Sequence, residues 1–168
     1  MKNLKLLVFI LAAITIKMQE AHAFELCKSS EILIFKCNLS GKVASLCLRK
    51  NTSELQYKFG QESKYDLIYP KLLKSSIEKF KLSTTHYPGG GENRIRFTNG
   101  IYSYFMYDIT KSQQDTTSLG SIQTAGIAVY TNGKRIANLR CENSETSIAP
   151  LAFEILQREE FSHDIDTD

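Results

Sequence analysis

Short runs of β-branched and aromatic residues, separated by residues that favour turns, make up most of this chain. Such residues pack well on a pleated surface, and the turn formers between them let the chain reverse direction. In the run 54–59 polar and apolar residues alternate strictly, which predicts one face in a core and one face in water. The predicted core residues are Leu55, Tyr57 and Phe59, and the predicted water-facing residues are Glu54, Gln56 and Lys58. The pattern therefore predicts an all-β protein, mainly an antiparallel meander.

Two Asn-Gly pairs predict tight hairpins. Both residues accept the positive φ angles of a turn whose twist matches that of paired strands. The predicted hairpins join 94–98 to 101–105 at Asn99-Gly100, and 122–130 to 135–141 at Asn132-Gly133.

The first hairpin also predicts which side chains share a face. Its expected register pairs Phe97 with Tyr102 and Ile95 with Tyr104, so these four residues would lie together on a buried face. The opposite face would then carry Arg94, Arg96, Ser103 and Phe105.

The number of runs limits the fold. About nine strands in the roughly 145 residues after the N-terminal segment fit one small barrel or sandwich of eight to nine strands. One or two short helices are expected beside it, at 71–81 and 150–160. The predicted organisation is a signal peptide at 1–23, a single β domain at 24–149, and a short helix with an acidic tail at 150–168. The end of that tail, 161–168, is expected to fray.

The N-terminus predicts export. Lys2 and Lys5 precede an apolar run at 6–16, and small residues at the −3 and −1 positions occur in Ala21-His22-Ala23. This arrangement is typical of a secretory signal peptide, and its apolar run is too short to span a bilayer comfortably. We therefore expect a periplasmic or secreted protein, of bacterial type, with no transmembrane segment.

Four cysteines, Cys27, Cys37, Cys47 and Cys141, follow the predicted cleavage site. An even number in an exported chain predicts two structural disulfides, which can be connected in three ways. The pairing favoured here is Cys27–Cys37 with Cys47–Cys141. Spacings of 10, 10 and 94 residues, without a C-x-x-C pair, disfavour a zinc site, so no metal is expected.

The charge distribution limits the class of partner. Loss of 1–23 removes three lysines and one glutamate and lowers the formal net charge from +3 to +1. Within the remainder, 154–168 carries six acidic residues against one arginine, which leaves the body at 24–153 mildly basic. Such a body fits weak attraction to anionic envelope surfaces, or an ordinary solvated surface. It lacks the dense basic patch of a nucleic-acid binder, so no nucleic acid is expected.

The sequence shows no pattern typical of an active site. His86 is the one histidine of the body, and no nucleophile motif accompanies it in Ser83-Thr84-Thr85-His86. Gly89-Gly90-Gly91 lacks the lysine of a phosphate-binding loop. A non-enzymatic protein without a cofactor is therefore expected, and a hydrolase whose residues come from separate strands is the alternative.

Two resemblances can be named. The segments Phe35-Lys36-Cys37, 43–47, 55–60 and 67–70 resemble a group of small exported bacterial proteins of unknown function. The aromatic strand after the Asn99-Gly100 turn, the segment 126–129 and the closing segment 138–141 are similar to the C-type lysozyme inhibitor family. The second resemblance implies a small eight-stranded antiparallel barrel that blocks a hydrolase cleft with a loop. Here Asn99-Gly100 replaces the family's Ser-Gly, and Ala125-Gly126 replaces its Lys-Gly.

The expected function is binding of a protein or glycan partner of the cell envelope or the extracellular medium. The alternative is inhibition of a lysozyme or another secreted hydrolase, for which the mildly basic body disfavours a basic lysozyme as the target. Exposed aromatic and arginine side chains provide rigid contact area, which makes them candidates for binding. The candidate binding residues are Arg94, Arg96, Asn99, Phe105, Tyr107 and Lys134.

Overall fold

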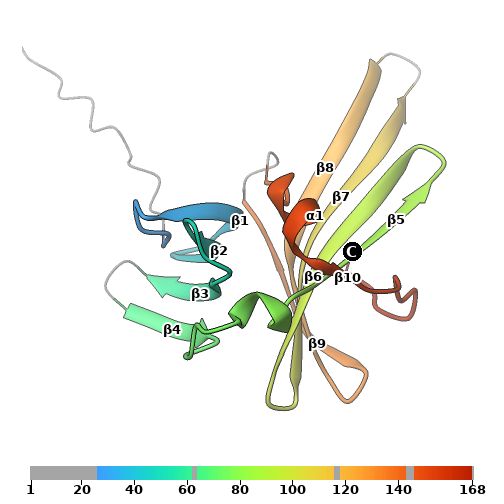
Figure 1. The fold of residues 1–168 in the computed structure, drawn as a ribbon. Coiled ribbons are helices and arrows are strands. Elements are labelled where there is room, and N and C mark those ends of the chain that lie inside the picture. The colour runs from blue at the N-terminus through green and yellow to red at the C-terminus, as the bar shows by residue number, and fades with distance from the viewer. Residues whose placement is uncertain (1–25, 62–63, 116–117, 143–145, 168) are drawn as a thin grey trace, which may run out of the picture.

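The structure is a computed structural model that describes residues 26–61, 64–115, 118–142 and 146–167. The predicted signal peptide, 1–23, lies outside the described residues. In the described ranges ten strands form two sheets, which confirms the all-β prediction (Figure 1). The sheets remain open and do not close into a barrel. None of the helices in these ranges has the length and apolar character needed to cross a membrane.

The first sheet has four antiparallel strands in sequence order. They are β1 (Glu31–Leu39), β2 (Lys42–Arg49), β3 (Leu55–Gln61) and β4 (Lys64–Tyr69). This order leaves β4 at an edge of the sheet, because it pairs with β3 alone.

The second sheet has six strands in the order β10-β5-β6-β7-β8-β9. They are β5 (Lys81–Tyr87), β6 (Gly90–Asn99), β7 (Tyr102–Asp115), β8 (Ser118–Thr131), β9 (Lys134–Arg140) and β10 (Gln157–Arg158). All its pairs are antiparallel except β10 with β5, which is parallel. Two short helical elements, η1 (Ser76–Lys79) and α1 (Leu151–Ile155), complete the described fold.

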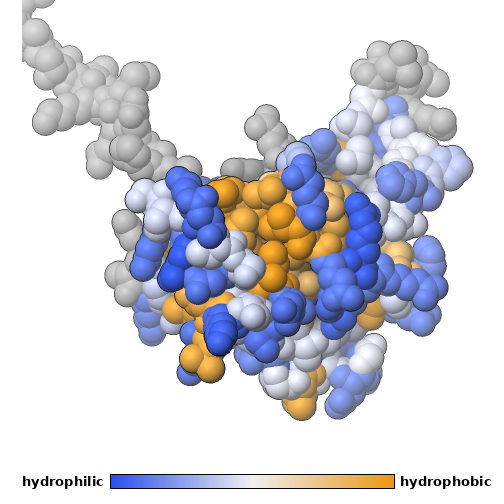
Figure 2. All heavy atoms as spheres, in the orientation of Figure 1, coloured by the Kyte–Doolittle hydropathy of each residue, from blue (hydrophilic) through white to orange (hydrophobic). Residues whose placement is uncertain are grey.

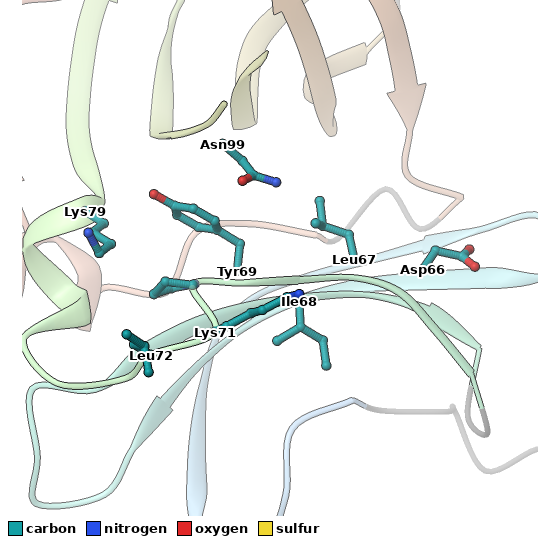
Figure 3. A pocket seen from close by; sticks show the side chains of 9 residues that line it. Asp66, Leu67, Ile68, Tyr69, Lys71, Leu72, Lys79 and Asn99 are labelled. Atoms are coloured by element: carbon teal, nitrogen blue, oxygen red, sulfur yellow. The ribbon is translucent and has the colours of Figure 1, made fainter. Parts of the chain in front are cut away.

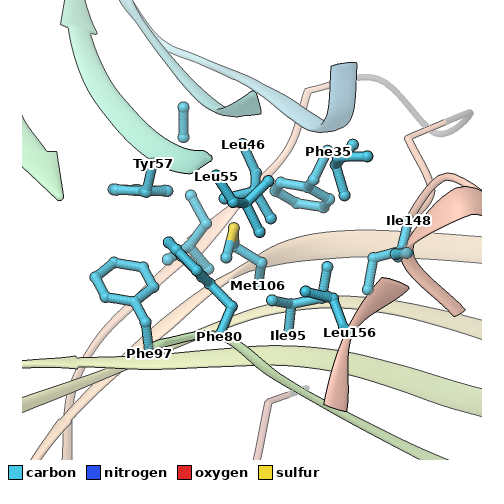
Figure 4. Packing of buried hydrophobic residues seen from close by; sticks show 14 of the residues in the cluster. Phe35, Leu46, Leu55, Tyr57, Phe80, Ile95, Phe97, Met106, Ile148 and Leu156 are labelled. Atoms are coloured by element: carbon cyan, nitrogen blue, oxygen red, sulfur yellow. The ribbon is translucent and has the colours of Figure 1, made fainter. Parts of the chain in front are cut away.

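The core lies between the two sheets. Phe35, Leu46 and Leu55 point into it from the four-stranded sheet, and Ile95 and Met106 point into it from the six-stranded sheet (Figure 4). Ala152 and Leu156, in and after α1, are buried in the same cluster. Figure 2 shows apolar side chains gathered over α1 and between the sheets, bordered by hydrophilic residues. The short helix α1, within the predicted helix range 150–160, therefore packs into the core between the sheets.

The disulfides differ from the favoured pairing. Cys27 is bonded to Cys47, and Cys37 is bonded to Cys141. Cys37 lies on β1 with its side chain in the core, where it meets Cys141 just after β9 of the other sheet. The prediction of two disulfides is confirmed and their connectivity was wrong, because strand faces, not distance along the chain, decide which cysteines meet.

Both predicted hairpins form, and the register of the first differs from the prediction. Phe97 pairs with Tyr104 and Ile95 with Met106, a shift of two residues from the predicted pairs. The loop consists of Gly100 and Ile101, with Gly100 at φ +62°, so glycine takes the first loop position. A shift of two keeps every side chain on its face, so Ile95 and Phe97 are buried and Tyr104 is partly buried as predicted. Tyr102 lies beside the turn and is exposed, so its predicted burial was wrong.

The helix prediction for 71–81 was wrong. Only η1 and the start of β5 lie there, because Phe80 enters the core from an extended backbone. The helix predicted at 150–160 ends at Ile155, and Gln157 and Arg158 pair with β5. The expected fraying of 161–168 was also wrong over the described residues: Thr167 is buried against the six-stranded sheet.

One residue of the alternating run departs from its predicted exposure. The Lys58 side chain is 4% exposed, with its Nζ 2.6 Å from Oε2 of Glu31 and 3.2 Å from the carbonyl oxygen of Leu26. A buried ammonium needs a charged partner and further acceptors, and the start of β1 supplies both. The outer face of the four-stranded sheet is thus covered here by the chain that precedes β1.

Candidate functional site

The structure places the six predicted binding residues in three regions. Arg94, Arg96, Phe105 and Tyr107 share the outer face of the six-stranded sheet, as predicted. Asn99 lies at the β6–β7 turn, and Lys134 lies at the β8–β9 turn. The register connects Asn99, Tyr102, Thr131 and Lys134 in one row, so both turns lie at the same end of that sheet.

The outer face is not the open surface that the alternation predicted. Phe105, Tyr107 and Arg94 are buried, because the C-terminal segment 159–167 lies over them. Tyr107 donates a hydrogen bond from its hydroxyl to Oδ1 of Asn138, 2.9 Å away. Gly126 lies opposite Tyr107 in the ladder, and a Cβ there would come within 2.4 Å of the tyrosine hydroxyl oxygen. Glycine at this position therefore makes room for the Tyr107 ring.

An open pocket of about 630 Å³ lies between β4 and the β6–β7 turn. Figure 3 shows Tyr69 and Leu67 pointing from β4 toward Asn99, while Ile68 points to the other side of its strand. The lining also includes Lys71, Leu72 and Lys79, whose side chains could contact a ligand. The pocket thus combines an aromatic ring, an amide, two ammonium groups and an edge strand.

The local sequence explains why a pocket forms here. Pro70 follows β4 and, lacking an N–H, cannot extend the ladder. The chain then leaves the sheet through Lys71 and Leu72 and returns to the core only at η1 and Phe80. Leu72 remains 82% exposed at the pocket, although its apolar side chain would ordinarily be buried.

A stack of aromatic rings fixes the back of the pocket. The Tyr69 ring stacks on Phe97 with centroids 4.8 Å apart, and Phe97 stacks on Tyr104 at 4.7 Å. Tyr57 approaches Phe97 from the other sheet at 4.9 Å. Burial raises the pKa of Tyr69 and of Tyr104. Tyr69 is therefore held in place from behind while one side of it faces the pocket.

The side chains around the pocket carry an excess of positive charge. Asp66 is on the lining, but its carboxylate lies 2.7 Å from Nζ of Lys42, and that hydrogen bond lowers its pKa. Within the described part of the chain, neither Lys71 nor Lys79 forms an ion pair. Glu78 on η1 is the acidic neighbour of Lys79 along the chain. Two exposed ammonium groups thus remain available to an anionic group in the pocket.

Burial of Tyr57 leads to a prediction for alkaline pH. Burial, together with the neighbouring Tyr104, raises the pKa of Tyr57 far above its ordinary value. Because the folded pKa exceeds the unfolded value of about 10, this contribution to stability is complete below pH ~10 and is lost as the pH rises above it. We expect the free energy of unfolding to fall as the pH rises above ~10, and to fall less in Tyr57→Phe. Denaturant unfolding at several pH values measures the free energy of unfolding of the parent and of Tyr57→Phe, and tyrosinate absorbance is the second readout. Equal slopes of that free energy against pH for the two proteins would contradict the prediction.

Two titratable side chains, His86 and Asp108, lie away from this pocket. His86 pairs with Gly91, at the other end of β6 from Asn99. Asp108 accepts hydrogen bonds from Nδ2 of Asn93 at 2.7 Å and from the backbone N–H of Ile148 at 2.6 Å. Burial is the main cause that raises the pKa of Asp108. These contacts attach the segment before α1 to the sheet, which is a structural role.

One cluster of metal-ligating side chains occurs among the described residues. It consists of Cys27, Glu31 and Cys47. Its two cysteines are joined in a disulfide and cannot act as thiolate ligands, while Glu31 already pairs with Lys58. The cluster does not fit a metal ion.

Sequence reasoning missed most of the pocket. The sequence predicts Asn99 as a binding residue, but it places Lys71 and Lys79 in the expected helix at 71–81 and does not indicate Tyr69 as a binding residue. The available signal was Tyr69-Pro70 followed by Lys71 and Leu72, which ends a strand without providing a good helix start. Comparison with known protein families, with curated proteins and with solved structures finds no match to this chain. The function is therefore inferred from the geometry of the site itself.

Proposed function

We propose that this chain is an exported, non-catalytic β protein that binds an envelope or extracellular partner through the pocket between β4 and the β6–β7 turn. Two disulfides support an oxidising compartment outside the cytoplasm. The signal-peptide pattern at 1–23 supports export, to the periplasm or the medium. The observation that carries the binding proposal is the pocket, where Lys71 and Lys79 have no ion-pair partner among the described residues.

The lining favours a partner that carries carboxylate or phosphate groups. Lys71 and Lys79 supply charge, the Asn99 amide can donate and accept hydrogen bonds, and the Tyr69 ring offers a flat apolar surface. A pocket of this openness suits an extended ligand that is only partly enclosed. We favour an acidic glycan of the cell envelope, for which stacking and charge pairing together provide recognition.

The test uses oxidised mature protein on an array of acidic and neutral glycans. Lys71→Ala/Lys79→Ala is expected to weaken capture of acidic glycans at least about tenfold, since each lost charged hydrogen bond is worth about 1.5–3 kcal/mol. Lys28→Ala/Lys36→Ala removes the same charge from residues that do not line the pocket and is the matched control, expected to bind as the parent does. Equal capture by both double variants, or capture of neutral glycans alone, would reject the pocket as the binding site.

Inhibition of a secreted hydrolase is the second candidate. Ile101 is 67% exposed at the β6–β7 turn, and Leu72 is exposed on the neighbouring turn. Tight turns with exposed apolar tips can enter a cleft, as the resemblance to the lysozyme inhibitor family implies. Titration of lysozymes and other secreted hydrolases with the oxidised protein tests this candidate. Loss of activity at a one-to-one ratio, relieved in Asn99→Ala or Lys134→Ala, would favour inhibition; unchanged activity would reject it.

A further inference from the structure

The C-terminal segment, residues 159–167, crosses the outer face of the six-stranded sheet and is held there mainly by side chains. Before it, the two residues of β10 pair with β5, and the N–H of Glu159 donates to the carbonyl oxygen of Leu82 at 2.9 Å. Beyond Glu159 the segment belongs to no strand (Figure 1). It therefore rests on the sheet in the way that a bound peptide would.

Two arginines of β6 hold the start of the segment. Arg96 binds the Glu159 carboxylate with two of its nitrogens, Nε at 2.9 Å from Oε1 and Nη2 at 2.5 Å from Oε2. The Arg94 guanidinium lies 3.9 Å from the centre of the Phe161 ring and donates from Nη1 to the carbonyl oxygen of Ser162 at 2.8 Å. Such paired and stacked contacts are the ones in which arginine is most specific.

The end of the segment is held mainly by hydrogen bonds between side chains of the sheet and the backbone of the segment. The Tyr130 hydroxyl donates to the carbonyl oxygen of Asp166 at 2.6 Å and accepts from its N–H at 2.8 Å. Asn138 donates from Nδ2 to the carbonyl oxygen of Thr167 at 3.1 Å. The Thr167 hydroxyl reaches the buried carboxylate of Glu92. Capture of both polar backbone groups of a residue is a feature of peptide-binding surfaces.

An apolar patch lies under the middle of the segment. Phe105, Tyr107, Ile109, Ala128 and Tyr130 form a buried cluster separate from the main core, and Ile165 packs against it. Without the segment this aromatic patch, together with the buried Arg94–Glu92 pair, would face solvent. The sheet thus presents the parts of a peptide-binding site: two arginines, an apolar patch, and side chains that form hydrogen bonds with the backbone of the segment.

We infer that this outer face is a peptide-binding surface, and that the C-terminal segment of a second copy of the chain can replace the resident one. The occupant follows from charge complementarity, because Glu159 and Asp166 of the segment pair with Arg96 and Arg135 of the sheet. Tethering gives the resident segment an effective concentration on the order of millimolar, so the closed monomer dominates until those contacts are weakened. This inference is independent of the pocket at Asn99.

Two full-length variants separate the two halves of the interaction. The acceptor variant, Phe161→Ala/Ile165→Ala, keeps the sheet face and weakens its own segment. The donor variant, Arg94→Ala, keeps the segment and weakens the face. Glu160→Ala/Asp164→Ala changes exposed residues of the same segment and is the matched control. A labelled peptide of sequence 157–168 is the probe.

We expect the peptide to bind the acceptor variant at least about tenfold more tightly than the parent or the control, because only there is the face vacated. Mixing acceptor and donor variants should give a one-to-one complex by light scattering, while each alone stays monomeric. If Phe161→Ala/Ile165→Ala does not fold, Phe161→Leu/Thr167→Val serves as the milder acceptor. A folded acceptor variant that binds no peptide at about 1 mM, the scale of the tether, overturns the inference.

Discussion

Replacing Cys37 and Cys141 together by alanine is expected to lower the free energy of unfolding by about 5 kcal/mol. The bond joins residues 104 apart in sequence, and a cross-link that closes a long loop removes the most entropy from the unfolded chain. It also connects β1 of one sheet to the end of β9 of the other. Its loss therefore acts on the contact between the sheets as well as on the unfolded chain.

The second disulfide provides the control. Cys27 and Cys47 are 20 residues apart, so Cys27→Ala/Cys47→Ala is expected to lose about 3 kcal/mol. Guanidinium unfolding of the two double variants, followed by far-ultraviolet circular dichroism, measures the difference. An equal or larger loss in Cys27→Ala/Cys47→Ala would contradict the assignment of Cys37–Cys141 as the main link between the sheets.

Phe97→Ala is expected to lower the free energy of unfolding by about 3–5 kcal/mol, as for other buried aromatic residues. The Phe97 side chain is fully buried at 0% exposure. Its ring contacts four others from both sheets: Tyr57, Tyr69, Phe80 and Tyr104. Since these rings come from different elements, the cavity cannot close by the movement of one side chain.

The same substitution affects the pocket. Tyr69 loses the ring on which it stacks, so ligand capture should weaken in a protein that is still folded. Ile101→Ala, on the exposed turn that follows β6, is the control and should change the free energy of unfolding by less than about 0.5 kcal/mol. Similar losses in Phe97→Ala and Ile101→Ala, measured by denaturant unfolding, would show that the aromatic stack does not hold the two sheets together.

Local pattern predicted much of the fold because local chemistry decides it. The strands around Asn132-Gly133 form as expected, since Asn132 and Gly133 both adopt the positive φ angles that the turn requires. The buried face of Ile95, Phe97 and Tyr104 is also confirmed. An error of two residues in register left that face intact, because side chains alternate with a period of two.

Lys58 and the C-terminal segment show where the same pattern fails. Alternation assigned Lys58 to water, and the composition of 161–168 suggested a frayed end. Both lie against segments distant in sequence: Lys58 against Glu31, and Thr167 against Glu92. A charged residue is buried only where a partner of opposite charge arrives, and the sequence does not say which segment arrives.

The sequence by itself determined most of the strands, their turns and most of the inward faces, which depend on neighbours within a few residues. Its even number of cysteines behind an export pattern also predicted the two disulfides. The tertiary structure alone decided that Cys37 meets Cys141, that the strands form two open sheets and not the closed barrel that was one of the two predicted forms, and that the acidic tail covers Arg94 and Phe105. It also decided that Tyr69, Lys71 and Asn99 line one pocket. The physical reason is the same in each case: these contacts join elements that are distant in sequence, and which of them meet depends on how the two sheets pack.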